Sequence, residues 1–139
     1  LMNQEQLDFL KLSNITEEMY NEADDKSYIN ECLILKNQEY SQNFNKQYIK
    51  YIFAPKIKIL NENMFRQNFE LLEVYAPNVI QMDFGAFLLC DQLQELDFPL
   101  LQITSAYTFT RSDSLIKVEL PSLKIAGNYS FYNCKSLEV

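Results

Sequence analysis

The chain has 139 residues, of which 47% are hydrophobic and 14% are aromatic, and its 12 basic and 19 acidic side chains give a formal net charge of −7. This size and hydrophobic content suffice for one compact domain or one short solenoid. The negative charge would repel a nucleic-acid backbone and an anionic membrane surface, and no apolar run approaches the roughly 18 residues of a membrane-spanning helix, so neither partner is expected.

Residues 1–47 contain neither proline nor glycine and are expected to form a mostly helical flank that covers the end of the repeats that follow. The apolar side chains that would line a first short helix are Leu7, Phe9, Leu10 and Leu12. Thr16 precedes an acidic stretch and is suited to cap a second helix. A degenerate repeat of roughly 20 residues is a further interpretation of this flank. The residues that suggest it are Ile29, Cys32, Ile34 and Phe44.

From residue 48 onward the sequence repeats with a step of 22 residues, the spacing between successive prolines, and such a fixed step is typical of a repeat protein. The prolines are Pro55, Pro77, Pro99 and Pro121. The phenylalanines that follow them at a constant distance are Phe65, Phe87, Phe109 and Phe131, and a leucine column comprises Leu71, Leu93, Leu115 and Leu137. The expected units are residues 48–70, 71–92, 93–114 and 115–136, with a fifth beginning at 137.

The residues before each proline alternate in the manner of a β-strand, whose successive side chains point to opposite faces. The inward set is Ile52 and Ala54, Val74 and Ala76, Leu96 and Phe98, and Val118 and Leu120. The outward set is Tyr51, Phe53, Glu73, Tyr75, Glu95, Asp97, Lys117 and Glu119. Proline is expected to close each strand, because it has no N–H group to donate to a neighbouring coil.

A second inward pair is expected after each proline, and the pairs are Ile57 and Ile59, Val79 and Gln81, Leu101 and Ile103, and Leu123 and Ile125. Gln81 is polar and fits an inward position poorly. The favoured explanation is a local register shift that turns Gln81 outward and places Ile80 or Met82 inward instead. The phenylalanines would stack as a buried aromatic spine. A small polar or thiol side chain follows each of them, namely Asn68, Cys90, Ser112 and Cys134. Cys90 and Cys134 would lie roughly 10 Å apart in stacked coils, too far for a disulfide.

The unit from Leu93 through Pro99 and Phe109 to Ser112 resembles the leucine-rich repeat, and the last unit, with Pro121 and Cys134, resembles its BspA-like (Treponema-type) subtype. The resemblance covers residues 48–139. It implies a solenoid of stacked 22-residue coils with short parallel strands. Since the chain lacks an initial methionine and stops three residues into a unit, we expect a fragment of a longer array.

Catalytic chemistry is not expected, because the chain has no histidine for a nucleophilic triad or a histidine-containing zinc site. Its two glycines, Gly85 and Gly127, cannot assemble a phosphate-binding loop or a dinucleotide fingerprint. The acidic pairs lack the loop spacing of a calcium site. We therefore expect no enzyme, no metal and no cofactor.

The outward strand residues are the expected binding face, because stacked repeats array them side by side. Tyr51, Phe53 and Tyr75 are the proposed apolar anchors for a protein or a cell-surface glycan. The resemblance implies a cell-surface or secreted adhesion module. The alternative is an intracellular scaffold or regulatory array, which the free thiols and the absence of a disulfide pattern favour.

Overall fold

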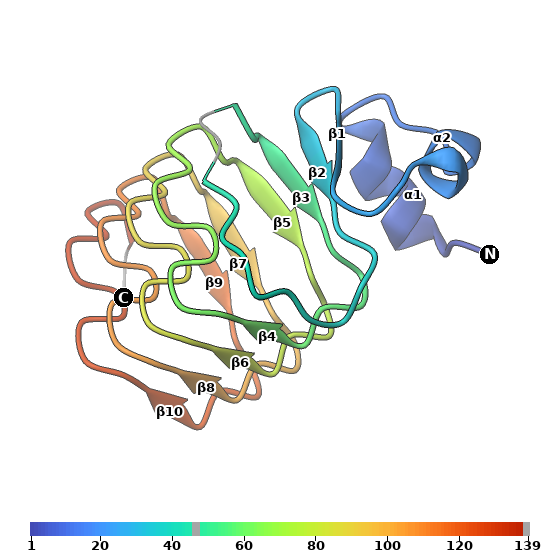
Figure 1. Ribbon diagram of the computed structural model, residues 1–139. Coiled ribbons are helices and arrows are strands. Elements are labelled where there is room, and N and C mark those ends of the chain that lie inside the picture. Colours follow the sequence, from blue (N-terminus) through green and yellow to red (C-terminus); the bar gives the residue numbers. More distant parts are fainter. Residues whose placement is uncertain (46–47, 138–139) are drawn as a thin grey trace.

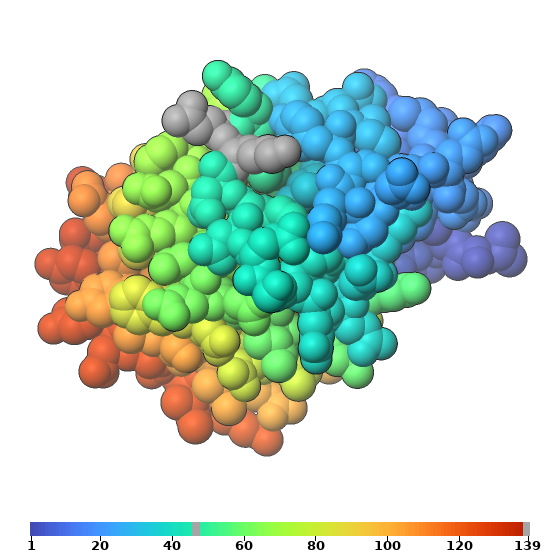
Figure 2. Space-filling model, in the orientation of Figure 1, coloured from blue at the N-terminus to red at the C-terminus, as the bar shows by residue number. Residues whose placement is uncertain are grey.

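The computed structural model describes residues 1–45 and 48–137 and consists of two short helices followed by a stack of similar coils (Figure 1). The space-filling view shows the coils as successive bands from the N-terminal flank to the last coil (Figure 2). Each coil therefore contacts mainly the coils before and after it, as expected of a solenoid.

Each coil from residue 51 onward contributes one three-residue strand and one two-residue strand. The longer strands are β3 (Tyr51–Phe53), β5 (Glu73–Tyr75), β7 (Glu95–Asp97) and β9 (Lys117–Glu119). The shorter strands are β4 (Ile59–Leu60), β6 (Gln81–Met82), β8 (Ile103–Thr104) and β10 (Ile125–Ala126). Strands of the same kind follow one another along two faces of the molecule (Figure 1).

The strands pair in parallel at the repeat step that the prolines predict. Ile52 lies opposite Val74 in the β3–β5 ladder, and Leu96 lies opposite Val118 in the β7–β9 ladder. The shorter strands form a second parallel sheet in the order β10-β8-β6-β4. Each proline comes two residues after the end of a longer strand, as Pro99 does after Asp97. The predicted solenoid of stacked 22-residue coils with short parallel strands is confirmed.

The interior is built around the phenylalanine column. Successive rings of Phe65, Phe87, Phe109 and Phe131 stack with centroids 5.4, 5.6 and 5.3 Å apart. Phe44 extends the stack, with its ring centroid 6.0 Å from that of Phe65. The residues of the leucine column are fully buried at Leu71, Leu93 and Leu115 and partly buried at Leu137. Burial of these rings between neighbouring coils makes the spine a principal source of stability.

The second inward position after each proline differs from the sequence-based expectation. Leu60, Met82 and Thr104 are buried, whereas Ile59, Gln81 and Ile103 lie toward the surface. The expected inward role of Ile59, Ile103 and Ile125 is therefore wrong. The shift favoured for Gln81 also occurs in the coils of Leu60 and Thr104, whereas in the last coil both Ile125 and Ala126 are exposed. The physical reason is that the strand begins only at residue 59, so alternation does not extend back to the buried Ile57.

Three of the four small side chains that follow the phenylalanines bond to the backbone of an adjacent coil, whereas the Ser112 hydroxyl has no hydrogen-bond partner within the described residues. The Cys90 thiol donates to the carbonyl of Phe65 at 3.3 Å, and that of Cys134 donates to the carbonyl of Phe109 at 3.1 Å. Asn68 donates from Nδ2 to the carbonyl of Phe44 at 2.7 Å. The three cysteines are free and buried. These side chains thus join one coil to the next.

The N-terminal flank contains two helices, the first predicted from its apolar spacing and the second from Thr16 as its cap. Asn3 caps the N-terminus of helix α1 (Gln4–Lys11), and its side chain accepts from the amide of Gln6. Thr16 caps α2 (Glu17–Glu22), and its hydroxyl accepts from the amide of Met19. An antiparallel hairpin follows, formed by β1 (Ser27–Ile29) and β2 (Cys32–Ile34). Because β2 pairs in parallel with β3, the ladder begins before residue 48. The division of the chain at residue 48 stays a prediction.

Candidate functional site

The longer strands of the coils present a continuous outward face. The middle residue of each strand packs in the main core, and these residues are Ile52, Val74, Leu96 and Val118. Because side chains alternate along a strand, the first and third residues point away from this core. They are the eight residues expected from the sequence, namely Tyr51, Phe53, Glu73, Tyr75, Glu95, Asp97, Lys117 and Glu119.

Helix α1 covers the first part of this face. The ring of Phe9 lies 6.2 Å from Tyr51, 5.9 Å from Phe53 and 5.7 Å from Tyr75, measured between ring centroids. Phe53 and Tyr75 stack on each other at 5.2 Å. Together with Leu10, which is fully buried, these rings form a second hydrophobic cluster, outside the coils.

The expectation that Phe53 and Tyr75 are exposed to solvent is therefore wrong. Their exposed fractions are 0% and 8%, and Tyr51 is partly buried. The cause is the N-terminal flank, whose position cannot be read from the repeat register. A signal for this contact was nevertheless present in the apolar spacing of Leu7, Phe9, Leu10 and Leu12, because an amphipathic helix must bury its apolar side against something.

The remainder of the outward face is open. Glu95 and Asp97 on β7 are exposed, as are Lys117 and Glu119 on β9, whereas Glu73 on β5 is partly buried. Lys117 and Glu119 form an ion pair at 3.4 Å. The strand face thus has an aromatic part beneath α1 and a charged part beyond it.

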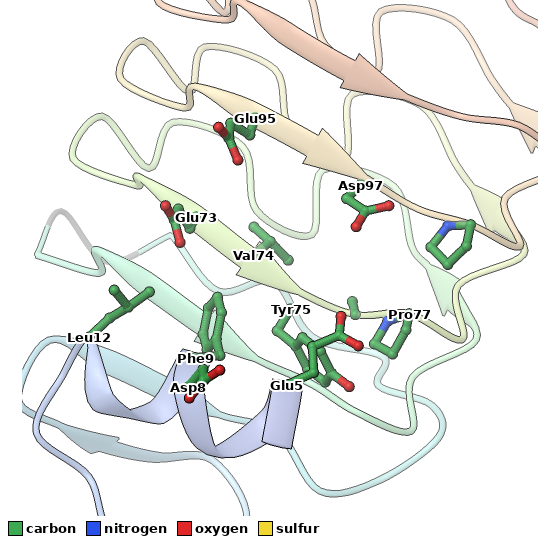
Figure 3. Close-up of a pocket in the computed structure, with 12 residues that line it drawn as sticks. Glu5, Asp8, Phe9, Leu12, Glu73, Val74, Tyr75, Pro77, Glu95 and Asp97 are labelled. Carbon is green, nitrogen blue, oxygen red and sulfur yellow. The ribbon is translucent and has the colours of Figure 1, made fainter. Parts of the chain in front are cut away.

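A groove of about 310 Å³ lies where the two parts meet, between α1 and the strands β5 and β7 (Figure 3). Helix α1 contributes Glu5, Asp8 and Phe9, and Leu12 follows the helix at its C-terminal end. The strand side includes Glu73, Val74 and Tyr75 of β5, Glu95 and Asp97 of β7, and Pro77 and Pro99 beyond the strands. Acidic side chains thus stand on both walls, and apolar side chains lie between them.

Among the residues that the structure describes, the negative charges of the groove carboxylates have few neighbouring cations or hydrogen-bond donors. Burial raises the pKa of Glu73, and the negative charge of Glu95 raises it further. Asp8 accepts from Gln4 and lies 3.8 Å from the ammonium group of Lys11. Within residues 1–45 and 48–137, the other four groove carboxylates have neither a side-chain hydrogen bond nor an ion pair.

No catalytic or metal-binding arrangement accompanies this groove in the described part of the chain. The groove contains carboxylates but no nucleophile paired with a base, and the sequence has no histidine. Among residues 1–45 and 48–137, no three or more histidine, cysteine, aspartate or glutamate side chains are arranged so that they could hold a metal ion. No helix of these residues has the length and apolar character needed to cross a membrane.

Comparison with solved structures places the fold among leucine-rich repeat proteins. A crystal structure of a T. pallidum leucine-rich repeat protein is similar to the chain with a TM-score of 0.65 and 18% sequence identity. The similar region covers 76% of this chain and 56% of that protein, so the chain spans little more than half of its length. At this identity the likeness concerns the fold alone.

Comparison with sequence families gives the more direct assignment. A search of curated proteins found no significant match. The family described as "BspA type Leucine rich repeat region" matches residues 39–138 in 6 copies. This range includes all the prolines and phenylalanines of the repeat register, as the resemblance noted in the sequence predicts. The chain belongs to the BspA-type leucine-rich repeat family.

Proposed function

We propose that this chain is a non-catalytic protein-interaction module whose partner lies on the open strand face. Its contact residues are Glu73, Glu95, Asp97, Lys117 and Glu119. The repeat family suggests such a module. A rigid stack of coils also suits it, because binding then costs little conformational entropy in the module itself.

The observation that carries this proposal is the groove between α1 and the strands. A groove with two walls offers a partner more contact area than a flat sheet, and contact residues at the centre of an interface contribute most when water is excluded from them. The apolar side chains of Phe9 and Pro77 line it, between acidic walls. Tyr51, Phe53 and Tyr75, proposed from the sequence as anchors for a partner, instead anchor α1.

A protein partner is favoured over a glycan. Aromatic rings are the side chains on which sugar rings stack, and those of the strand face pack against Phe9 of α1. The open part carries charged side chains instead, which suit the polar rim of a protein interface. Adhesion at a cell surface and scaffolding inside a cell would use this same face.

Site-specific photo-crosslinking tests the proposal. A photoreactive amino acid is introduced at residue 97 on β7, and separately at residue 125 on β10, where Ile125 is 58% exposed on the other sheet. Each variant is irradiated in an extract of the source cells. We expect a protein adduct from residue 97 that excess unlabelled wild-type chain suppresses. Adducts that form only from residue 125 would place the partner on the other sheet and refute the proposal.

A further inference from the structure

We propose that the groove between α1 and β5–β7 accepts basic side chains from an extended segment of the partner protein. This inference rests on the proposed function and adds the chemistry of the partner. It commits to one occupant, a segment with two lysine or arginine residues separated by one residue. The groove's shape, its apolar lining and its charge each support it.

The apolar lining of the groove suits the stem of a basic side chain. Phe9 on the helix, with the ring of Tyr75 and Pro77 on the strand side, provides a surface against which methylene groups can pack. Lysine and arginine bury such stems along apolar surfaces while their charged ends stay at a polar rim. A short aliphatic side chain would fill part of this space but would bring no positive charge to the carboxylates of the walls.

The negative charge of the groove walls favours a positively charged side chain of the partner. Glu5 and Asp8 extend from α1, and Glu73, Glu95 and Asp97 extend from the strands (Figure 3). No lysine or arginine is among the groove's lining residues in the described part of the chain. An acidic segment would be repelled from both walls, whereas a basic segment would relieve the repulsion between Glu73 and Glu95.

The spacing of the carboxylates matches an extended partner. Glu95 and Asp97 are the first and third residues of β7, so they point to the same side, and two strand residues span roughly 6.6 Å. An extended segment presents alternate side chains on one side with the same period. Two basic residues separated by one residue can therefore face Glu95 and Asp97 together. The partner segment would contact side chains on the open strand face. It therefore would not have to pair its backbone with a free strand edge of the solenoid.

Binding of defined peptides tests this inference. The probes are a fluorescently labelled heptapeptide that alternates lysine with valine and a counterpart in which glutamate replaces lysine. Affinity is measured by fluorescence anisotropy with the whole chain at low and high salt. We expect the basic peptide to bind and the acidic one not to bind. Because the attraction is between charges at a partly exposed site, affinity should fall as salt rises.

The charge-neutral variant E95Q/D97N should bind the basic peptide about tenfold more weakly, since two modest charge contacts are lost. The matched control E39Q/E62Q removes two exposed carboxylates outside the groove and should bind as the wild type does. Circular dichroism verifies that all variants are folded. Equal affinities of wild type and E95Q/D97N, or equal binding of both peptides, would overturn the inference.

This result is separable from the test of the proposed function. If the basic peptide fails to bind while residue 97 still gives a specific cross-linked adduct, the partner lies on the strand face but has another chemistry. If residue 97 gives no adduct while the basic peptide binds at Glu95 and Asp97, the groove recognises cations and the assignment of a protein partner fails.

Discussion

The ring of Phe9 lies 5.9 Å from the ring of Phe53, although the first belongs to a helix of the N-terminal flank and the second to a strand of the repeat stack. This contact decides which part of the strand face is open. It places α1 over β3 and the end of β5, and it creates one wall of the groove. The flank therefore shapes the candidate binding surface as well as covering the first coil.

Replacement of Phe9 by alanine should loosen α1 from the strand face. Phe9 is only partly buried, so we expect the variant to lose about 2 kcal/mol of folding stability, less than the 3–5 kcal/mol typical of a fully buried ring. Urea unfolding measures the loss, and binding of a hydrophobic dye reports exposure of Phe53 and Tyr75. Leu12→Ala is the control, because Leu12 follows the same helix but is 46% exposed. Equal losses in both variants would contradict the docking role of Phe9.

Truncation of a phenylalanine at the centre of the aromatic spine should reduce folding stability more than truncation of Phe9. Phe109 is fully buried between Phe87 and Phe131, so Phe109→Ala should cost about 3–5 kcal/mol through the cavity that it leaves. Phe84→Ala is the matched control, because Phe84 is 39% exposed, and its cost should stay below about 1 kcal/mol. Chemical denaturation measures both. A loss at Phe109 no greater than at Phe84 would show that the spine is not a main source of stability.

Glu73 should make stability fall as pH rises over a defined range. Burial, and then the charge of Glu95, raises the pKa of Glu73 in the folded chain above its ordinary value of 4.5. The unfolded chain therefore loses this proton first, and the contribution of Glu73 to stability declines from pH 4.5 up to the raised folded pKa. Glu73→Gln stays neutral, so it should be more stable than the wild type at neutral pH, and the difference should shrink below pH 4.5.

Unfolding curves across this pH range measure the difference between Glu73→Gln and the wild type. The exposed Glu62→Gln provides the comparison, and its difference from the wild type should be smaller at neutral pH. A Glu73→Gln variant whose advantage stays constant from acid to neutral pH would show that ionisation of Glu73 is not its cause.

The thiols should be inert while the chain is folded. Burial raises the pKa of Cys90 to about 12, so almost no thiolate exists at neutral pH, and Cys32 and Cys134 are buried as well. A thiol reagent should modify Cys32 and Cys90 only at the rate of unfolding. Cys134 should react first, because it is 9% exposed whereas Cys32 and Cys90 are fully buried. Rapid labelling of Cys90 in the native chain would contradict its burial between the coils.

The repeat stack could be predicted from the sequence because the same residue types recur at the same positions in every unit. The column that contains Phe109 recurs at a fixed step, and each proline fixes the end of a strand, so the inward position of Leu96 and the outward position of Glu95 follow from alternation. The residues after the proline were harder to assign. There, a change from irregular backbone to strand at residue 59 places Leu60 inward in place of Ile59.

The groove could be predicted only in part. Its strand wall was expected, since Glu73, Glu95 and Asp97 were assigned to the outward face. Its helix wall was not, because the position of Phe9 depends on tertiary packing between a segment that does not repeat and the coils that do. The apolar spacing indicated that α1 would bury one side of the helix. It did not indicate that this side would pack against Tyr51, Phe53 and Tyr75.

Carboxyl footprinting tests the central claim most directly, namely that the partner lies on the open strand face. The protein captured at residue 97, once identified and purified, is mixed with the chain, and its carboxylates are labelled with a carbodiimide and an amine. Mass spectrometry then compares labelling with and without the partner. We expect protection of Glu73, Glu95 and Asp97, with Glu39 and Glu62 unchanged. Protection of Glu39 or Glu62 while Glu95 and Asp97 remain fully reactive would contradict the claim.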